Sequence, residues 1–326
     1  MKDWRYRLRE HRGTLLAFAF FIFMFAIYAS NHPAGFTANV VQTAANKGAL
    51  LALVAMAQTF VVLTAGIDLS VGMVFVLTNC LASWIVVGSP AMAGLGIVAV
   101  LLTGLICGAI NGAIVIYGRL QPIVTTIATG AIYFGIALAL RPVPGGDVES
   151  GLADALTGRV LGVIPASLVA LAVVVFVIWV PYRRSAIGRA AYAVGSSEIA
   201  AYMSGVPVRA AKFFAYVLSG LVASIGGLFL TLITASGEAS AANGGSYTLY
   251  SIAAVVLGGV SLFGGSGSAI GAIFGALMFR TIGDLLFVFD LDPLWQPLFQ
   301  GVVLLAAVCL GSARLFQIRN RLDLFE

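Results

Sequence analysis

Long apolar runs separated by short polar segments recur along the whole chain. A transmembrane helix needs about 20 predominantly apolar residues to cross roughly 30 Å of hydrocarbon. The pattern predicts ten helices of this kind, at residues 15–30, 47–65, 68–88, 91–117, 122–140, 161–181, 211–235, 247–263, 267–289 and 295–312. The second and third runs also fit one interrupted element. The predicted fold is therefore all-α, a polytopic integral membrane protein of about ten transmembrane helices, with residues 1–326 as a single transmembrane domain.

Composition agrees with this fold class. The mean hydropathy is +1.04, with 60% hydrophobic and 10% charged residues. Soluble domains carry about 25% charged residues, so a soluble enzyme is excluded. The three cysteines and two histidines share no spacing pattern and predict neither a disulfide nor a metal site. The net charge of +5 lies at the ends of the apolar runs, so we expect no nucleic-acid partner.

The positions of Lys and Arg predict the orientation, because cytoplasmic loops carry an excess of these residues. With the N-terminus inside, one set of segments collects most of the cations: Lys2, Arg5, Arg7, Arg9, Arg12, Arg119, Arg183, Arg184, Arg189, Arg209, Lys212, Arg314, Arg319 and Arg321. The other set keeps little more than Lys47, Arg141 and Arg159. We therefore expect both termini to be cytoplasmic and the first run to be an uncleaved span.

One carboxylate, Asp68, lies between Gly66 and Gly72 in a long and otherwise uncharged apolar stretch. A carboxylate at this depth costs about 2.5 to 3.5 kcal/mol on insertion scales, so its presence needs a reason. Transporters build sites and gates from polar, Gly-interrupted breaks of this kind. Alternatively, Asp68 caps a helix at the membrane surface by accepting backbone N–H groups. Both interpretations stay open, and they are compatible.

A second break resembles the first. Residues 61–66 (VVLTAG) resemble residues 255–259 (VVLGG), and Ser and Gly follow each stretch. Matching breaks in two halves of a chain point to a translocation path. The span count places the two copies six helices apart, so this weak repeat would be parallel.

Glycine recurs at every fourth position in two of the spans. The stripes are Gly104, Gly108 and Gly112, and Gly267, Gly271 and Gly275. Such stripes let helix backbones approach closely in lipid, where packing must replace the hydrophobic effect. Packing within one chain is favoured here over a subunit interface.

The segment at about 182–210 is too polar to span the membrane. Ser196 or Ser197 can cap a short helix from Glu198 to Met203, which Gly205 would end. A short, capped helix on a basic face suits docking into a groove of a partner protein. The alternative is a helix that lies on lipid, which the poor apolar face expected of this segment disfavours.

Five stretches carry a resemblance to a known family: 66–72, 111–112, 121–126, 188–205 and 257–267. Together they resemble permease subunits of bacterial ABC importers, in the ribose/xylose/arabinose/galactose family of simple-sugar permeases. The resemblance covers about residues 40–310. It leaves the substrate open, because Ile123, Ile127 and Ser197 depart from the family pattern.

The resemblance implies an importer in the bacterial inner membrane. A second permease chain, identical or different, would complete the pathway, a cytoplasmic ABC ATPase would power it, and a periplasmic sugar-binding protein would deliver the substrate. The ATPase would dock on Gly188, Arg189, Gly195, Glu198, Ala201 and Gly205. The chain has no Gly-x-x-x-x-Gly-Lys-Ser/Thr motif, so we expect it to carry no cofactor and to be no enzyme. ATP and Mg would be bound by the partner ATPase.

The predicted substrate is a monosaccharide or a related small polyol, and a branched-chain amino acid is the chief alternative. An ion-coupled secondary transporter is less favoured, because it would need several ionisable residues within the membrane. Only Asp68, Arg280 and Asp284 qualify, and the last two, one helical turn apart, can pair with each other. A membrane enzyme would need a nucleophile and base or a metal cluster, and the sequence offers none.

Polar side chains within the spans are the candidates for the substrate pathway. They can bond sugar hydroxyls, and they would be costly on a lipid-facing surface. The candidates are Gln58, Thr64, Asp68, Ser70, Asn79, Asn111, Thr125, Thr126 and Ser261. The alternative for each is that it only bonds a neighbouring helix.

Overall fold

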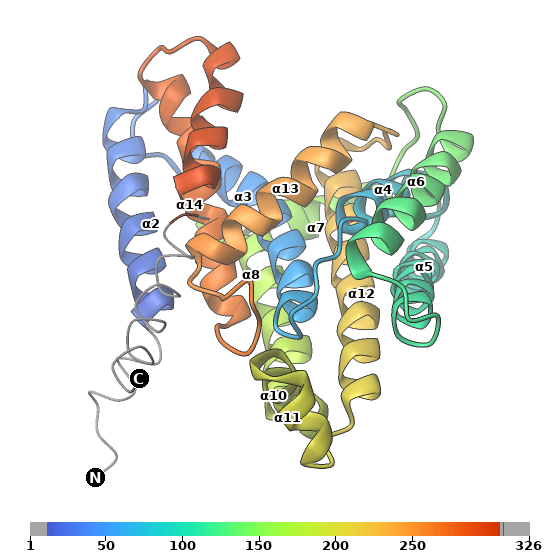
Figure 1. Ribbon diagram of the computed structural model, residues 1–326. Coiled ribbons are helices and arrows are strands. Elements are labelled where there is room, and N and C mark those ends of the chain that lie inside the picture. Colours follow the sequence, from blue (N-terminus) through green and yellow to red (C-terminus); the bar gives the residue numbers. More distant parts are fainter. Residues whose placement is uncertain (1–11, 307–308, 310–326) are drawn as a thin grey trace, which may run out of the picture.

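The computed structural model describes residues 12–306 and 309, and helices account for most of this part (Figure 1). The long helices are α2 (Arg12–Asn31), α3 (Ala38–Val62), α4 (Val71–Ile85), α5 (Pro90–Ile116), α6 (Pro122–Leu140), α12 (Val208–Thr234), α13 (Ala241–Leu257) and α14 (Ala269–Val288). Shorter elements are α7 (Ser150–Thr157), α8 (Ala166–Val174), the π-helix η1 (Val175–Trp179), α9 (Val180–Arg184), α10 (Ala186–Ser196), α11 (Glu198–Met203) and the 3-10 helix η2 (Pro293–Trp295). One hairpin pairs β1 (Arg159–Val160) with β2 (Ile164–Pro165).

The predicted all-α membrane fold is confirmed. Seven helical segments in the described residues are long and apolar enough to cross a membrane, one of them the continuous run Ala166–Arg184. Two shorter apolar helices, α4 and Gln296–Ala306, add to these. Each predicted span overlaps a helix of the structure.

Several predicted boundaries were wrong, among them those of the eighth span, which is α13 at Ala241–Leu257 rather than 247–263. The second span begins at Ala38 rather than at residue 47, and Thr37 caps it by accepting a hydrogen bond from the N–H of Val40. Lys47 consequently lies inside α3 and not in a loop. The sixth span begins at Ala166 rather than at residue 161, because residues 159–165 form the hairpin.

The central helix of the fold is α3, and all its residues from Gly48 to Val62 are buried. Helices α8, α12, α13 and α14 pack around it (Figure 1). A helix that is apolar on every side needs this surrounding. Helices α4, α5 and α6 extend from the core on one side, and α2 packs on α14 on the other.

The glycine stripes pack helices within the chain, as favoured from the sequence. A Cβ atom at Gly104 would lie 2.4 Å from the carbonyl oxygen of Gly220 on α12. One at Gly275 would lie 2.1 Å from the carbonyl oxygen of Ala254 on α13. Because real Cβ atoms do not approach so closely, only glycine allows these two helix pairs to meet as they do.

The two predicted breaks lie side by side. The first connects α3 to α4 and the second connects α13 to α14. The N–H of Gly265, in the second break, donates a hydrogen bond to the carbonyl oxygen of Leu63, in the first, at 3.1 Å. Segments about 200 residues apart in sequence thus meet at one place.

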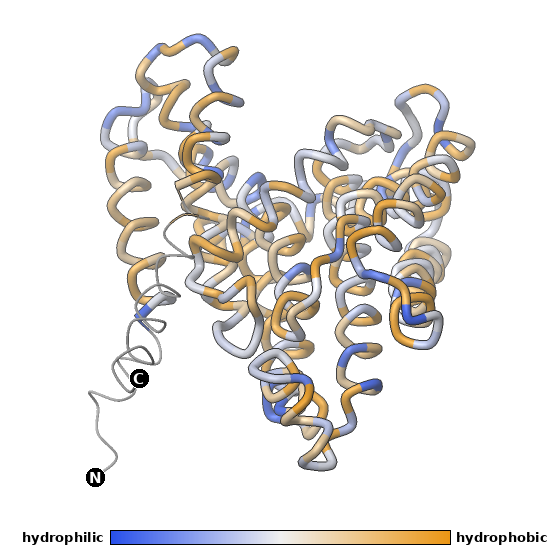
Figure 2. Tube along the Cα trace, in the orientation of Figure 1, coloured by the Kyte–Doolittle hydropathy of each residue, from blue (hydrophilic) through white to orange (hydrophobic). Residues whose placement is uncertain are grey.

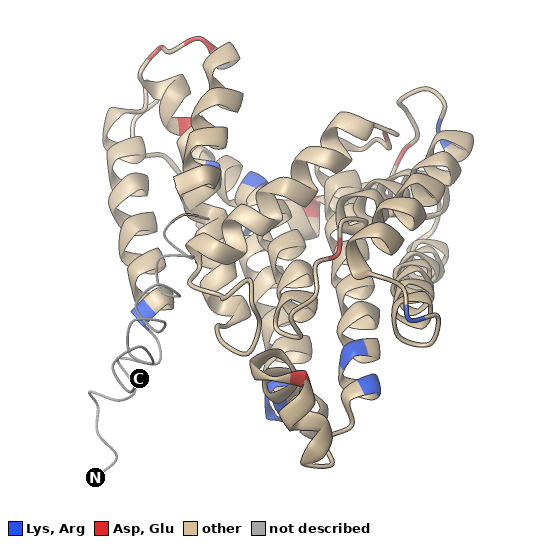
Figure 3. Cartoon of the chain, viewed as in Figure 1, with Lys and Arg blue, Asp and Glu red and all other residues tan. Residues whose placement is uncertain are grey.

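Charge is distributed unevenly between the two ends of the molecule. Apolar residues dominate the helices, and polar ones gather at the turns (Figure 2). Lys and Arg concentrate around α10 and the start of α12, which we call the basic end (Figure 3). Most Asp and Glu residues lie elsewhere, many of them in the turns of the opposite end.

Candidate functional site

A buried polar cluster occupies the first break. Asp68 is 2% exposed. Its Oδ1 accepts hydrogen bonds from the N–H and the hydroxyl of Ser70, at 2.9 and 2.6 Å. Its Oδ2 accepts a longer one, 3.4 Å, from the hydroxyl of Ser219 on α12. The carboxylate therefore shapes the start of α4 and ties it to α12.

Helices α5 and α6 hold the same break from the other side. The amide of Asn111 donates to the Ser70 hydroxyl at 2.7 Å, and the Tyr133 hydroxyl donates to Asn111 Oδ1 at 3.1 Å. The N–H of Leu69 donates to the Thr126 hydroxyl at 3.0 Å. We call the side chains that bond around this break the Asp68 cluster: Asp68, Ser70, Asn111, Thr126, Tyr133 and Ser219.

The structure supports the cap interpretation of Asp68 in that the carboxylate accepts a backbone N–H beside the start of α4. The carboxylate is buried within the protein and also bonds a side chain of α12. The hydroxyl, amide and carboxylate groups of the Asp68 cluster bond one another in this structure.

The nine predicted pathway residues do not form one site. Asp68, Ser70, Asn111 and Thr126 belong to the Asp68 cluster. Asn79 lies further along α4, where its amide donates to the Thr231 hydroxyl at 2.9 Å and to the carbonyl oxygen of Ser236 at 3.1 Å.

The remaining four predicted pathway residues divide into two kinds. The Thr64 hydroxyl bonds the carbonyl of its own helix end, and Ser261 accepts the N–H of Phe263 within the second break. Gln58 and Thr125, in contrast, are buried with side-chain polar atoms that have no hydrogen-bond partner. Buried polar groups are normally paired, so these two positions call for a partner.

Sequence reasoning missed three partners, Tyr133, Ser219 and Thr231. The one available signal was the phenol of Tyr133, because a tyrosine in an apolar run usually directs its hydroxyl to a polar group. Among the described residues, no three His, Cys, Asp or Glu side chains lie close enough together to hold a metal ion.

The predicted cytoplasmic segment forms two helices, α10 and α11. The expected short helix, its Ser197 cap and its end at Gly205 are all observed. The preceding helix α10 was not predicted. It begins at Ala186, and the preceding Ser185 caps it: the Ser185 hydroxyl accepts the N–H of Gly188 at 2.9 Å.

Helix α10 touches both breaks. A Cβ atom at Gly195 would lie 2.0 Å from the carbonyl oxygen of Leu63 and 2.3 Å from the nitrogen of Gly265. The Tyr192 hydroxyl donates to the carbonyl oxygen of Gly267 at 2.7 Å. Helix α10 is therefore packed backbone to backbone against both breaks.

Helix α11 presents large apolar side chains outward. Ile199, Tyr202 and Met203 are 80%, 74% and 81% exposed. Their spacing of three and four residues places them on one helical face. The expectation of a poor apolar face was therefore wrong, because Ala201 is buried and the larger apolar side chains face outward.

The six predicted docking residues differ in burial: three are exposed and three are buried. Arg189, Glu198 and Gly205 are exposed; Glu198 pairs with Lys212, and Arg189 bonds the carbonyl oxygen of Arg184. Gly188, Gly195 and Ala201 are buried against their own chain. Those three can position the two helices but do not present a surface to a partner.

Apart from the Asp68 cluster, three charged side chains lie close together between α2, α3 and α14. Lys47 Nζ lies 3.9 Å from Asp284 Oδ1. The expected pair between Arg280 and Asp284 does not form, because Asp284 faces Lys47 across the helix contact instead. Arg280 Nε is buried without a hydrogen-bond partner.

Comparison with known proteins identifies the class of this chain. Residues 40–308 match the family described as "Branched-chain amino acid transport system / permease component". The match covers most of the chain, so the chain belongs to this family of permeases. No solved structure gives a significant match.

Similar curated proteins are named as sugar import permeases. The chain is 35% identical over 298 residues to the "Ribose import permease protein RbsC" of Haemophilus influenzae, covering 90% of this chain and 91% of that protein. It is 33% identical over 275 residues to the "Fructose import permease protein FrcC" of Rhizobium meliloti, covering 81% and 75%. It is 29% identical over 307 residues to the "D-allose transport system permease protein AlsC" of Escherichia coli, covering 91% and 90%.

Proposed function

We propose that this chain is the transmembrane permease subunit of an ATP-driven importer that carries a monosaccharide across the bacterial inner membrane. The similarity to permeases named for ribose, fructose and allose supports a sugar. The family description names branched-chain amino acids instead, but it applies to the whole family, whereas the sugars are named for individual relatives of this chain. We therefore favour the sugar.

The observation that carries the proposal is the position of α10 and α11 at the basic end. Helix α11 exposes the apolar face of Ile199, Tyr202 and Met203, and α10 is pressed against both breaks at Gly195. An apolar helix face of this kind fits a groove in a partner protein. A cytoplasmic ABC ATPase that holds α11 would displace α10, and with it both breaks.

The remaining parts of the importer follow from this role. A second permease chain, identical or different, completes the pathway, and a periplasmic sugar-binding protein delivers the substrate. Both termini are cytoplasmic, in keeping with the concentration of Lys and Arg at the basic end. ATP and Mg bind to the ATPase, so this chain needs no cofactor and catalyses no reaction.

Gln58 and Thr125 are the strongest pathway candidates, because their unpaired polar atoms could bond sugar hydroxyls when the helices separate. In a chain whose native cysteines are replaced by alanine, a hydrophilic thiol reagent should modify Thr125→Cys during transport. Ala52→Cys, buried in the apolar part of α3, is the control. Equal protection of both positions would remove Thr125 from the pathway.

Retention of the ATPase during purification tests the docking surface. Ile199→Asp should weaken the complex about tenfold or more, because burying an isoleucine contributes about 1.5 to 3 kcal/mol. Leu161→Asp is the matched control, since Leu161 is 89% exposed in the hairpin. If Ile199→Asp retains the ATPase as well as Leu161→Asp does, α11 is not the docking helix.

A further inference from the structure

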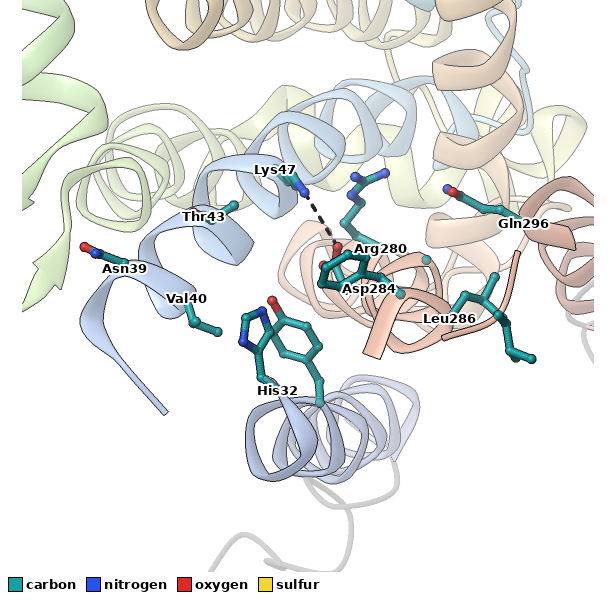
Figure 4. Close-up of a pocket in the computed structure, with 13 residues that line it drawn as sticks. His32, Asn39, Val40, Thr43, Lys47, Arg280, Asp284, Leu286 and Gln296 are labelled. Atoms are coloured by element: carbon teal, nitrogen blue, oxygen red, sulfur yellow. Dashed lines mark ion pairs between the residues drawn. The ribbon is translucent and has the colours of Figure 1, made fainter. Parts of the chain in front are cut away.

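A cavity of about 390 Å³ with several charged and polar side chains in its lining lies between α2, α3 and α14 (Figure 4). Lys47, Arg280 and Asp284 line it, together with uncharged polar side chains such as His32, Thr43 and Gln296. Lys47 is nine residues inside α3, about 13 Å from the start of that helix at 1.5 Å per residue. Lys47 therefore lies two turns inside α3 rather than at the end of that helix.

The cavity carries an excess of positive charge. Among the described residues that line it, Lys47 and Arg280 face a single carboxylate, Asp284, which is 3.9 Å from Lys47. Arg280 Nε has no hydrogen-bond partner. Cations within a membrane are costly unless they are paired, so this arrangement favours an anion beside Arg280 and Lys47.

An apolar groove of about 500 Å³ adjoins the cavity and shares Arg280 and Asp284 with it. Phe21, Phe25 and Leu277 are among the side chains that line it. Helix α2 packs mainly against α14, so the groove lies where α2 stands away from α3 and α8. A flexible hydrocarbon chain matches a long apolar channel of this kind.

We propose that the cavity and the groove together bind one anionic phospholipid. Its phosphate lies between Lys47 and Arg280, and one acyl chain fills the groove between α2 and α3. A free phosphate would use the cations but leave the groove empty. A neutral sugar would use the polar side chains but leave the excess charge unpaired.

Native mass spectrometry of the full chain in detergent tests the proposal with dioleoylphosphatidylglycerol as the probe. The wild type should take up one such lipid saturably and bind it more tightly than dioleoylphosphatidylcholine. Lys47→Gln and Arg280→Gln should each weaken this binding about tenfold, the loss expected for a charge-assisted hydrogen bond. Lys47→Arg should retain it. Arg119→Gln, which removes an exposed charge from the α5–α6 turn, is the matched control and should bind as the wild type does.

Thermal unfolding of each variant without added lipid establishes that the variant is folded. If a glutamine variant is not folded, Lys47→Arg still tests the site, because it keeps the positive charge and should keep the lipid bound. Equal binding of the two lipids, or binding unaffected by Lys47→Gln and Arg280→Gln, would overturn the proposal in favour of ordinary contact with bulk lipid. Displacement of the lipid by millimolar inorganic phosphate would assign the cavity to a free oxyanion. Displacement by ribose would assign it to the transported sugar.

Discussion

At the scale of single residues, Asp68 shows how one buried carboxylate can organise a break between two helices. It accepts the Ser70 N–H and the hydroxyls of Ser70 and Ser219, so it joins α4 to α12 at the point where the backbone turns. Its position in an apolar run made it conspicuous in the sequence. The contacts of Tyr133 and Ser219 could not be predicted, because their partners are 22 and 151 residues away along the chain.

Asp68→Asn and Asp68→Leu should therefore behave differently. The asparagine can still accept the Ser70 N–H, so Asp68→Asn should keep the fold and much of the transport. The leucine cannot, and an unsatisfied buried donor costs about 1 to 3 kcal/mol. Thermal unfolding in detergent measures the difference, and equal melting temperatures for the two variants would show that the carboxylate does not hold the break.

At the scale of elements, the sequence predicted α11 well and α3 and α10 less well. Helix α11 has a serine cap, a short run and a terminal glycine, all of which are local signals. The first turns of α3 were missed because they are polar. The structure explains why these turns are polar: Gln42 and Asn46 donate hydrogen bonds to the carbonyl oxygen of Thr157, at 2.8 and 3.0 Å.

Helix α10 was missed although its buried residues Ala190, Ala191 and Val194 recur at helical spacing, because most of the residues on that face are small. Its glycines are explained only by what they touch, and that is tertiary information. Gly195 meets Leu63 in one break and Gly265 in the other. A single sequence gives no indication that these three positions meet.

Gly195→Ala should uncouple ATP hydrolysis from uptake while the protein still inserts into the membrane. The added methyl group would lie 2.0 Å from a backbone oxygen, so α10 and the breaks must shift apart. Overpacking of this kind costs about 1 to 3 kcal/mol. Gly94→Ala on α5 is the control, since nothing lies within 4 Å of its added Cβ. If both variants couple ATP hydrolysis to uptake as the wild type does, the contact of α10 with the breaks is not the coupling route.

At the scale of the whole molecule, the basic end, the paired breaks and the Asp68 cluster form one connected arrangement. Helix α11 presents an apolar face, α10 presses on both breaks, and the first break carries the buried polar side chains. The all-α class and the approximate positions of the apolar helices followed from hydropathy, because lipid forces backbone groups to bond within helices. Which polar residues meet could not be predicted, since that depends on how the helices pack.

Uptake by proteoliposomes that contain this chain, with the ATPase and binding protein that co-purify with it from its native membrane, tests the central claim most directly. Labelled ribose should accumulate only when ATP is supplied to the ATPase, and a protonophore should not reduce that accumulation. Uptake of leucine but not of ribose would contradict the sugar assignment. Uptake of ribose that persists without ATP and collapses with the protonophore would contradict an ATP-driven importer altogether.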